Sequence, residues 1–298
     1  MSWQQLIIRA EKKLSDDISA LMNKYGSLSI TLQDAEDQPI FEPPPETMPL
    51  WSQTLVSGLF PAQDNLDTLI VELNNKLSDE LVYKIEILED KDWVRAWMDD
   101  FKPMKFGQRL WICPSWLSPP DKNAVNIMLD PGIAFGTGTH PTTSLCLQWL
   151  DEYSLKNNIS TNSILDFGCG SGILSLAALS LGAKKVHAVD IDPQAIEASQ
   201  QNAIKNNCQK DLITYLPKQF ELVKSNLNID ILLANILSGP LLELGQMFAT
   251  LLVTGNHVVL SGLLKEQEQK IIAHYQQWFT IESVAQEQEW IRIHGIRK

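Results

Sequence analysis

Apolar and polar residues alternate in the first third of the chain, with two stretches in which apolar residues recur at helical spacing. Alternation is typical of half-buried strands, and recurrence every three to four residues is typical of amphipathic helices. The predicted strands cover residues 3–8, 27–32, 54–60 and 81–88, and the predicted helices cover residues 14–25 and 66–77. This order is the split βαβ arrangement of ferredoxin-like domains. We therefore expect residues 1–89 to form a small α+β domain.

The pattern changes after residue 160, where apolar strands alternate with helices and predict a parallel α/β sheet. Its strands are predicted at residues 163–167, 185–189 and 230–234 and a helix at residues 173–181, and two short strands at residues 109–113 and 125–129 lead into it. Between the two regions, Trp93, Trp97 and Phe101 recur every four residues among acidic side chains, which predicts an amphipathic connecting helix. We expect this linker at residues 90–104 and an α/β domain at residues 105–298.

The composition of the 298-residue chain is that of a globular protein, with 44% hydrophobic and 20% charged residues. No apolar stretch approaches the ~18 residues needed to cross a bilayer, and the first residues show no signal-peptide pattern. The four cysteines form no Cys-x-x-Cys pair, so neither a disulfide framework nor a zinc site is expected. These features predict a cytoplasmic protein with no membrane association and no metal.

Acidic residues concentrate in the first third of the chain. Of the formal net charge of −12, residues 1–90 contribute −10 through 16 acidic and 6 basic side chains, and residues 91–298 contribute −2 through 20 and 18. The acidic surface either keeps the protein dispersed or attracts a basic partner. In both cases the shortage of cations argues against direct binding of nucleic acid.

A glycine-rich turn lies between a predicted strand and a predicted helix, at Gly168, Gly170 and Gly172. Glycines at this place let the backbone approach a bound nucleoside and turn sharply into the helix. Asp190 ends the next predicted strand, where a carboxylate can accept hydrogen bonds from both ribose hydroxyls. These residues are therefore candidates for binding a nucleoside cofactor.

Two classes of cofactor use this geometry. Dinucleotide enzymes carry G-x-G-x-x-G, whereas this chain has G-x-G-x-G preceded by Asp166. The spacing departs from the dinucleotide pattern and resembles the first motif of S-adenosylmethionine-dependent methyltransferases. It therefore favours S-adenosylmethionine over a nicotinamide cofactor.

Asn235 ends another predicted strand and is followed by Ile236-Leu237-Ser238. The position resembles the Asn/Asp-Pro-Pro-Tyr motif of amino-group methyltransferases, although the prolines and the tyrosine are absent. An asparagine in the crevice beyond a parallel strand can orient an attacking amine through its side-chain oxygen. The alternative is that Asn235 only caps the following helix.

A second glycine-rich stretch, residues 130–143, lacks the Gly-Lys-Ser/Thr ending of a phosphate-binding loop. Thr143 lies at the start of a helix predicted at residues 143–150, where free amides and a hydroxyl would suit the methionine carboxylate of the cofactor. Phe135 is a candidate lid over the cofactor. His140 is either a structural residue or a group that transfers protons.

Together these motifs resemble one family along nearly the whole chain, the ribosomal protein L11 methyltransferases of bacteria. The resemblance rests on residues 129–132 and 135–143, on Asp166-Phe167-Gly168-Cys169-Gly170-Ser171-Gly172 and on Asn235-Ile236-Leu237. It extends to Phe41-Glu42-Pro43 and Glu89-Asp90-Lys91-Asp92-Trp93 in the first third.

The resemblance implies a ferredoxin-like domain that captures the substrate protein and a Rossmann-like domain that holds S-adenosylmethionine. It also implies methylation of lysine side chains and of the terminal α-amino group of ribosomal protein L11. The cofactor contacts it implies are Thr143, Gly168, Asp190 and Asn235. From the residues alone, two rivals stay open: a binding protein that only senses S-adenosylmethionine, and an enzyme that methylates a different partner.

Overall fold

The computed structural model describes residues 2–36, 38, 40, 47, 49–77, 81–88, 101–130 and 139–298. The chain divides into two compact units, residues 1–99 and residues 100–298. The predicted linker lies outside the described residues as far as residue 100, and so does Phe135. Within the described residues, no helix is long and apolar enough to cross a membrane.

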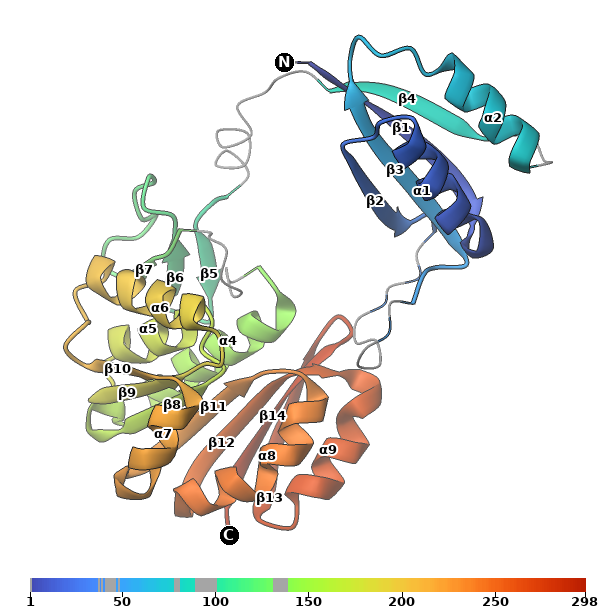
Figure 1. The fold of residues 1–298 in the computed structure, drawn as a ribbon. Coiled ribbons are helices and arrows are strands. Elements are labelled where there is room, and N and C mark those ends of the chain that lie inside the picture. The colour runs from blue at the N-terminus through green and yellow to red at the C-terminus, as the bar shows by residue number, and fades with distance from the viewer. Residues whose placement is uncertain are drawn as a thin grey trace. The chain divides into compact units, whose positions relative to one another are not determined.

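The first unit is a four-stranded antiparallel sheet with two helices on one face (Figure 1). Its elements are β1 (Trp3–Glu11), α1 (Ser15–Lys24), β2 (Ser29–Asp34), β3 (Gln53–Pro61), α2 (Asp67–Leu77) and β4 (Tyr83–Leu88). The strand order β2-β3-β1-β4 confirms the predicted ferredoxin-like arrangement.

The core of this unit follows from the alternation along β1, where every second residue faces the helices. Leu6 and Ile8 are fully buried and join Ile18 of α1 and Leu69 and Leu73 of α2 in one apolar cluster. Helical spacing places those three residues on the inner faces of their helices. Among the described residues of this unit, no side chain of an ionisable type is buried.

The second unit contains a small sheet and a large one. The small sheet has the order β5-β6-β7, with β5 (Met104–Phe106), β6 (Leu110–Cys113) and β7 (Val125–Met128). The large sheet has seven strands in the order β10-β9-β8-β11-β12-β14-β13. They are β8 (Ser163–Phe167), β9 (Lys185–Val189), β10 (Leu212–Tyr215), β11 (Ile229–Asn235), β12 (Leu252–Leu264), β13 (Phe279–Glu287) and β14 (Trp290–Arg297). Only β14 runs antiparallel to its neighbours in this sheet.

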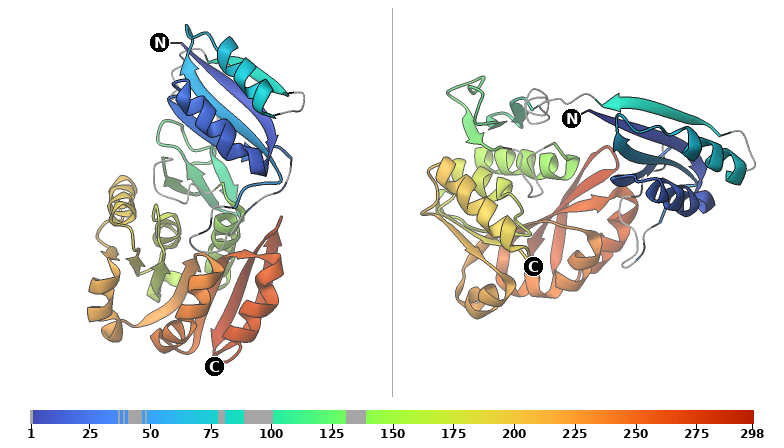
Figure 2. Two further views of the ribbon diagram at one scale, coloured as in Figure 1. Left: turned by 45° about the vertical axis from the view of Figure 1, so that its right-hand side comes forward. Right: turned by 45° about the horizontal axis from the view of Figure 1, so that its top comes forward.

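Helices cover both faces of the large sheet, as the two further views show (Figure 2). They are α4 (Pro141–Lys156), α5 (Ile173–Ser180), α6 (Pro193–Lys205), α7 (Pro217–Val223), α8 (Ser238–Leu251) and α9 (Glu268–Tyr275). Leu147, Leu176 and Ala203 of α4–α6 belong to one buried cluster, and Phe220 and Phe248 of α7 and α8 belong to another. The sheet is therefore buried on both sides, which explains its continuous apolar strands.

The strand order places the site. β8 and β11 are neighbours, but the chain reaches β11 only after β9 and β10, so the order reverses between them. Ligands bind in the crevice beyond the carboxyl ends of strands at such a reversal. Gly168 follows β8 and Asn235 ends β11, so both lie at this crevice.

Element bounds agree closely with the sequence pattern, with one notable difference. β8 and β9 have the predicted bounds, whereas α4 begins at Pro141 and ends at Lys156 instead of covering residues 143–150. Proline is favoured in the first turn of a helix because its missing amide would have no partner there. The helix is thus set two residues earlier than the apolar pattern indicates.

Candidate active site

The turn after β8 holds the glycines that were predicted to face the cofactor. Gly168 has a φ of +81°, a left-handed conformation that residues with a Cβ rarely adopt. A Cβ on this residue would also overlap Cγ2 of Ile236. The amides of Gly168 and Cys169 donate to the carbonyl oxygen of Val189, at 2.7 and 3.1 Å. The turn is therefore joined to the end of β9.

The structure brings the two candidates Gly170 and Asp190 together. The amide of Gly170 donates to Oδ2 of Asp190 at 2.9 Å, and the amide of Asp192 donates to Oδ1 at 3.0 Å. These two bonds orient the carboxylate beyond β9 while leaving each oxygen further capacity to accept. Asp190 is half-buried, so part of its carboxylate stays accessible.

Asn235 and Thr143 also lie together, although they come from β11 and α4. Nδ2 of Asn235 donates to Oγ1 of Thr143 at 3.3 Å, and Thr143 is fully buried. Oδ1 of Asn235 is buried without a hydrogen-bond partner among the described residues. A buried acceptor left unpaired costs about 1–3 kcal/mol, so it calls for a donor from a ligand. Asn235 makes no cap for α8, whose N-cap is Leu237, and the capping alternative is wrong.

The start of α4 corrects one expectation. The amide of Thr142 donates to Nδ1 of His140 at 3.4 Å, and the amides of Thr143 and Ser144 donate to the His140 carbonyl at 3.0 and 3.1 Å. The helix start therefore does not offer free amides to a carboxylate, because its own cap uses them. Thr143 contributes its hydroxyl instead.

His140 acts as the N-cap of α4. Its ring packs edge-on against the indole of Trp290, with 4.6 Å between centroids, and burial lowers its pKa. A neutral ring whose Nδ1 accepts from the first turn suits a cap. The geometry supports the structural role of His140.

Asp166 lies beneath the glycine turn and is only 1% exposed. Oδ2 accepts from the amide of Ser175 at 3.1 Å and from its hydroxyl at 2.6 Å, while Oδ1 is buried and lacks a partner among the described residues. Burial raises the pKa of Asp166 to about 6, although both bonds from Ser175 act in the opposite direction. The motif indicated this acid, but its burial and the part of Ser175 emerge only from the fold.

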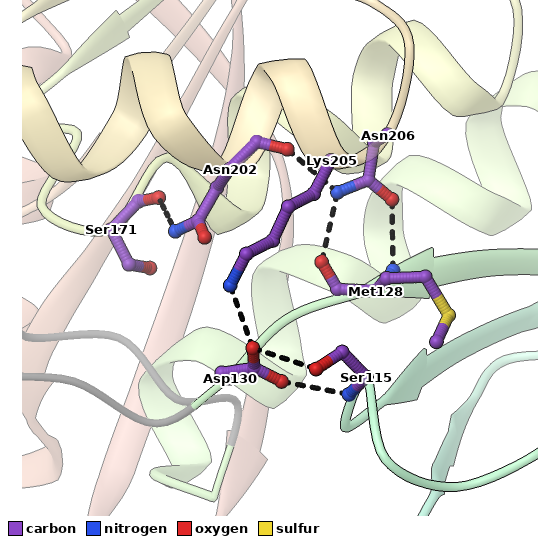
Figure 3. Close-up of polar contacts among 7 residues, drawn as sticks. All are labelled: Ser115, Met128, Asp130, Ser171, Asn202, Lys205 and Asn206. Carbon is purple, nitrogen blue, oxygen red and sulfur yellow. Dashed lines mark hydrogen bonds and ion pairs between the residues drawn. The ribbon is translucent and has the colours of Figure 1, made fainter.

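Polar side chains at the C-terminal end of α6 bond both the glycine turn and the segment at the end of β7 (Figure 3). Nδ2 of Asn202 donates to the carbonyl of Ser171 at 2.9 Å. One turn further on, Nζ of Lys205 pairs with Oδ2 of Asp130 at 2.6 Å. The side chain of Asn206 bonds both the amide and the carbonyl of Met128, each at 2.8 Å. One face of this helix thus fixes both the turn and the end of β7.

The end of β13 and the start of β14 reach the same edge of the sheet, which the sequence did not indicate. Oε2 of Glu287 accepts from the hydroxyl of Ser144 at 2.8 Å and from Nε2 of Gln148 at 3.4 Å. Trp290, the first residue of β14, packs against His140. These contacts come from segments more than 130 residues apart, so no local pattern announces them.

Comparison with known proteins identifies the family. The family model for "Ribosomal protein L11 methyltransferase (PrmA)" matches residues 2–298. The ribosomal protein L11 methyltransferases of Shewanella woodyi and Shewanella sediminis are 51% and 50% identical to this chain, and each comparison covers 100% of both chains. The chain belongs to the ribosomal protein L11 methyltransferase family.

A solved structure agrees with this membership. The ribosomal protein L11 methylase from Lactobacillus delbrueckii subsp. bulgaricus is 32% identical, with a TM-score of 0.58 over 66% of this chain and 100% of that chain. The seven-stranded sheet is thus that of the S-adenosylmethionine-dependent methyltransferases, as the first glycine motif predicted. No group of three or more metal-ligating side chains occurs within the described residues.

Proposed function

We propose that this protein transfers methyl groups from S-adenosylmethionine to lysine ε-amino groups and to the terminal α-amino group of ribosomal protein L11. The observation that carries the proposal is the pair formed by Asn235 and Thr143 at the sheet reversal, with Oδ1 of Asn235 buried and lacking a donor among the described residues. An amine, or an N–H group of the cofactor, is the donor that this oxygen needs. Family membership supports the same reaction.

The residues that would hold the cofactor are Thr143, Gly168, Gly170, Asp190 and Asn235. The left-handed Gly168 allows close approach of a nucleoside to the backbone. Asp190, oriented by two amides, would accept the ribose hydroxyls. When bound, S-adenosylmethionine supplies a methyl group already activated by a sulfonium.

The chemistry asks little acid–base work of this chain. Its main task is alignment of the nucleophilic nitrogen with the methyl carbon, because orientation supplies much of the rate of a displacement. The incoming amine must be neutral, whereas free lysine has a pKa of ~10.4. Desolvation in the crevice lowers the pKa of an amine, and Oδ1 of Asn235 can hold one of its hydrogens. We assign no general base.

The first unit would capture the protein substrate. Residues 1–90 carry a net charge of −10, and an acidic surface attracts a basic partner. We propose a division at residues 1–89 for recognition, 90–104 for the linker and 105–298 for catalysis. We also propose that the enzyme works in the cytoplasm, where a ribosomal protein is available as substrate, without direct contact to nucleic acid or membrane.

The direct test is incubation of the purified protein with S-adenosylmethionine and ribosomal protein L11, followed by mass spectrometry of intact L11. We expect intact L11 to gain about 14 Da for each methyl group that replaces a hydrogen, with one S-adenosylhomocysteine formed per methyl group. Mass spectra of L11 peptides should assign the methyl groups to lysines and to the terminus. A protein that only senses the cofactor would bind it and form no S-adenosylhomocysteine. Ribosomal protein L11 from cells lacking this protein should be undermethylated.

The cofactor assignment has its own test in Asp190→Ala. Loss of hydrogen bonds to a charged acceptor should weaken S-adenosylmethionine binding by roughly 1–3 kcal/mol, measured by calorimetry. Asp192→Ala is a suitable control, because within the described residues the side chain of Asp192 serves as the N-cap of α6 by accepting from the amide of Gln194. Equal affinities for wild type and Asp190→Ala would refute the ribose role.

A further inference from the structure

Ile236, the residue after Asn235, sits between two glycines that have left-handed backbone conformations. Gly168, after β8, has a φ of +81°, and Gly262, in β12, also has a φ of +81°. A Cβ on Gly168 would overlap Cγ2 of Ile236. A Cβ on Gly262 would overlap the carbonyl oxygen of Ile236 and lie 2.7 Å from its carbonyl carbon. One glycine thus makes room for the side chain of Ile236, and the other makes room for its backbone.

The second glycine lies at an irregularity in β12. Ser261 pairs with Asn235 in the register of β11 and β12, and the pairing of β12 with β14 shifts between Leu260 and Leu263. The extra residues of such a bulge bend a strand and re-aim its neighbours. Here the bulge brings the backbone of Gly262 against the residue that follows Asn235.

The same bulge also contains Ser261, the residue of β12 that pairs with Asn235 of β11. The hydroxyl of Ser261 is fully buried and lies 3.2 Å from the carbonyl oxygen of Thr142 and 3.1 Å from that of Ile291. Thr142 directly precedes Thr143, whose hydroxyl oxygen accepts from Asn235. Two consecutive residues of β12 therefore lie against the chain neighbours of the Asn235–Thr143 pair, Ser261 against Thr142 and Gly262 against Ile236.

We propose that the Ser261–Gly262 bulge, together with Ile236, is a positioning element that aims Oδ1 of Asn235 at the acceptor amine. This inference rests on the proposed methyl transfer and names residues that act on it through Asn235. Nδ2 of Asn235 donates to Thr143. Oδ1, which is buried and has no partner among the described residues, is therefore the side-chain atom left to accept a hydrogen from the amine.

β12 offers a matched control for Gly262. Gly255, in the same strand, also has a left-handed φ of +92°, but a Cβ there would meet no atom within 4 Å. Gly262→Ala and Gly255→Ala therefore share the backbone strain of a Cβ at positive φ, and only Gly262→Ala displaces Ile236. Their difference isolates the positioning effect.

Activity with ribosomal protein L11 is the first readout. Gly262→Ala should lower kcat at least about 10-fold while the Kd for S-adenosylmethionine changes by less than about 3-fold, because small misplacements of an aligning group act on the rate. Gly255→Ala should keep kcat within about 2-fold of wild type, since its strain lies away from the crevice. Equal kcat values for the two variants would overturn the inference.

A second pair of variants decides the question even if Gly262→Ala does not fold. Ile236→Val keeps both γ carbons and should retain wild-type kcat, whereas Ile236→Ala should lower kcat about 5-fold or more. Leu242→Ala, which removes another partly buried side chain packed on the same apolar cluster, controls for the loss of packing. If Ile236→Ala lowers kcat no more than Leu242→Ala does, the inference is wrong.

A spectroscopic readout separates this inference from the proposed function. The side-chain amide of Asn235 gives a pair of proton–nitrogen NMR signals, assigned by their loss in Asn235→Asp, in the cofactor-free protein. These signals should shift in Gly262→Ala and Ile236→Ala and stay in place in Gly255→Ala. If the signals follow that pattern but the wild-type protein does not methylate L11, the proposed function is refuted and the positioning of Asn235 is supported. If the wild-type protein methylates L11 but the signals do not shift in either variant, only the positioning proposal is refuted.

Discussion

The two units of this protein differ in whether they bury charged side chains. In the first unit they meet at the surface, as in the ion pairs Arg9–Glu36, Lys24–Glu72 and Lys76–Asp17, whose side chains are 37–60% exposed. In the described part of the chain, every buried side chain of Asp, Glu, His, Lys or Arg lies in the second unit. These are Asp151, Asp166, His187 and Arg292.

Burial alone does not mark the functional groups, as two aspartates of the second unit show. Asp151 is 1% exposed but well satisfied, because Oδ2 accepts from the amide of Gln108 at 2.6 Å and Oδ1 accepts from Nε of Arg109 at 3.2 Å. Asp166 is equally buried, but its Oδ1 has no partner within the described residues. Unsatisfied buried acceptors reduce stability and persist where function requires them. The second unit therefore buries an unpaired carboxylate oxygen beneath the glycine turn, whereas the unpaired buried atoms of the first unit belong to neutral groups such as the hydroxyls of Ser15 and Ser57.

The strongest test of this contrast is to separate the units. A shortened chain that starts at Phe101 should fold, because both sheets of the second unit lie beyond that residue. We expect S-adenosylmethionine affinity within about 3-fold of the full chain and at least a 100-fold (about 2.7 kcal/mol) loss of kcat/KM with L11. Calorimetry and a methylation assay measure the two quantities. Near-normal methylation by the shortened chain would show that the first unit serves another purpose, such as solubility.

Within the second unit, Asn235→Ala should have the next largest effect. Removing the amide that aligns the amine should lower kcat about 100-fold at saturating cofactor, with a smaller change in cofactor Kd. Asn256→Ala is the control, because Nδ2 of Asn256 bonds the Ile229 carbonyl at 2.7 Å, at the opposite end of β11. A wild-type kcat in Asn235→Ala would reduce this residue to a binding contact.

The pH dependence of the free energy of unfolding tests whether burial of Asp166 destabilises the protein. The pKa of Asp166 is raised to about 6 by burial, above the ~3.9 of a free aspartate, so its ionised form disfavours folding. This favourable contribution of the protonated form is complete below pH ~4 and is lost as the pH rises to about 6. Asp166→Asn lacks this titration, so its unfolding free energy should exceed that of wild type by about 3 kcal/mol well above pH 6 and by little at pH 4.

Asp151→Asn should change the free energy of unfolding in the opposite direction. This variant keeps the shape but loses the charge opposite Arg109, so it should be less stable than wild type at pH 7. Urea unfolding of both variants between pH 4 and pH 8 measures the two effects. Stabilities of Asp166→Asn and wild type that run in parallel over this range would contradict the proposed cost.

The sequence predicted the framework well because the signals there are local. Alternation and helical spacing located β8, β9 and the first unit, and glycine chemistry located the turn after β8. Asp190 and Asn235 were found because both follow apolar strands, and parallel strands bring their carboxyl ends to one edge.

The remaining parts of the site depend on contacts between distant segments. Glu287 meets Ser144 across 143 residues, and Ser261 reaches the carbonyl of Thr142 across 119 residues. No periodicity records such pairs. The expectation of free amides at α4 failed for a related reason: His140 supplies a cap from the histidine side chain, a residue type outside the usual capping set.

The smallest expected effect sharpens the contrast through salt. We expect the first unit to attract its partner through a net charge of −10 on residues 1–90. The attraction extends over about one Debye length, ~10 Å at 0.1 M salt. Cofactor binding instead depends on short bonds in the crevice, such as those that orient Asp190.

Raising the salt from about 0.05 to 0.3 M should therefore slow association with L11 several-fold and change the cofactor Kd by less than about 2-fold, because steering is screened and buried contacts are not. Stopped-flow binding of labelled L11 measures the first quantity, and calorimetry measures the second. A shortened chain starting at Phe101 should show almost no salt-dependent association, since residues 101–298 carry 16 basic and 17 acidic side chains, a net charge of only −1. Equal salt slopes for the two chains would place the steering charge outside the first unit.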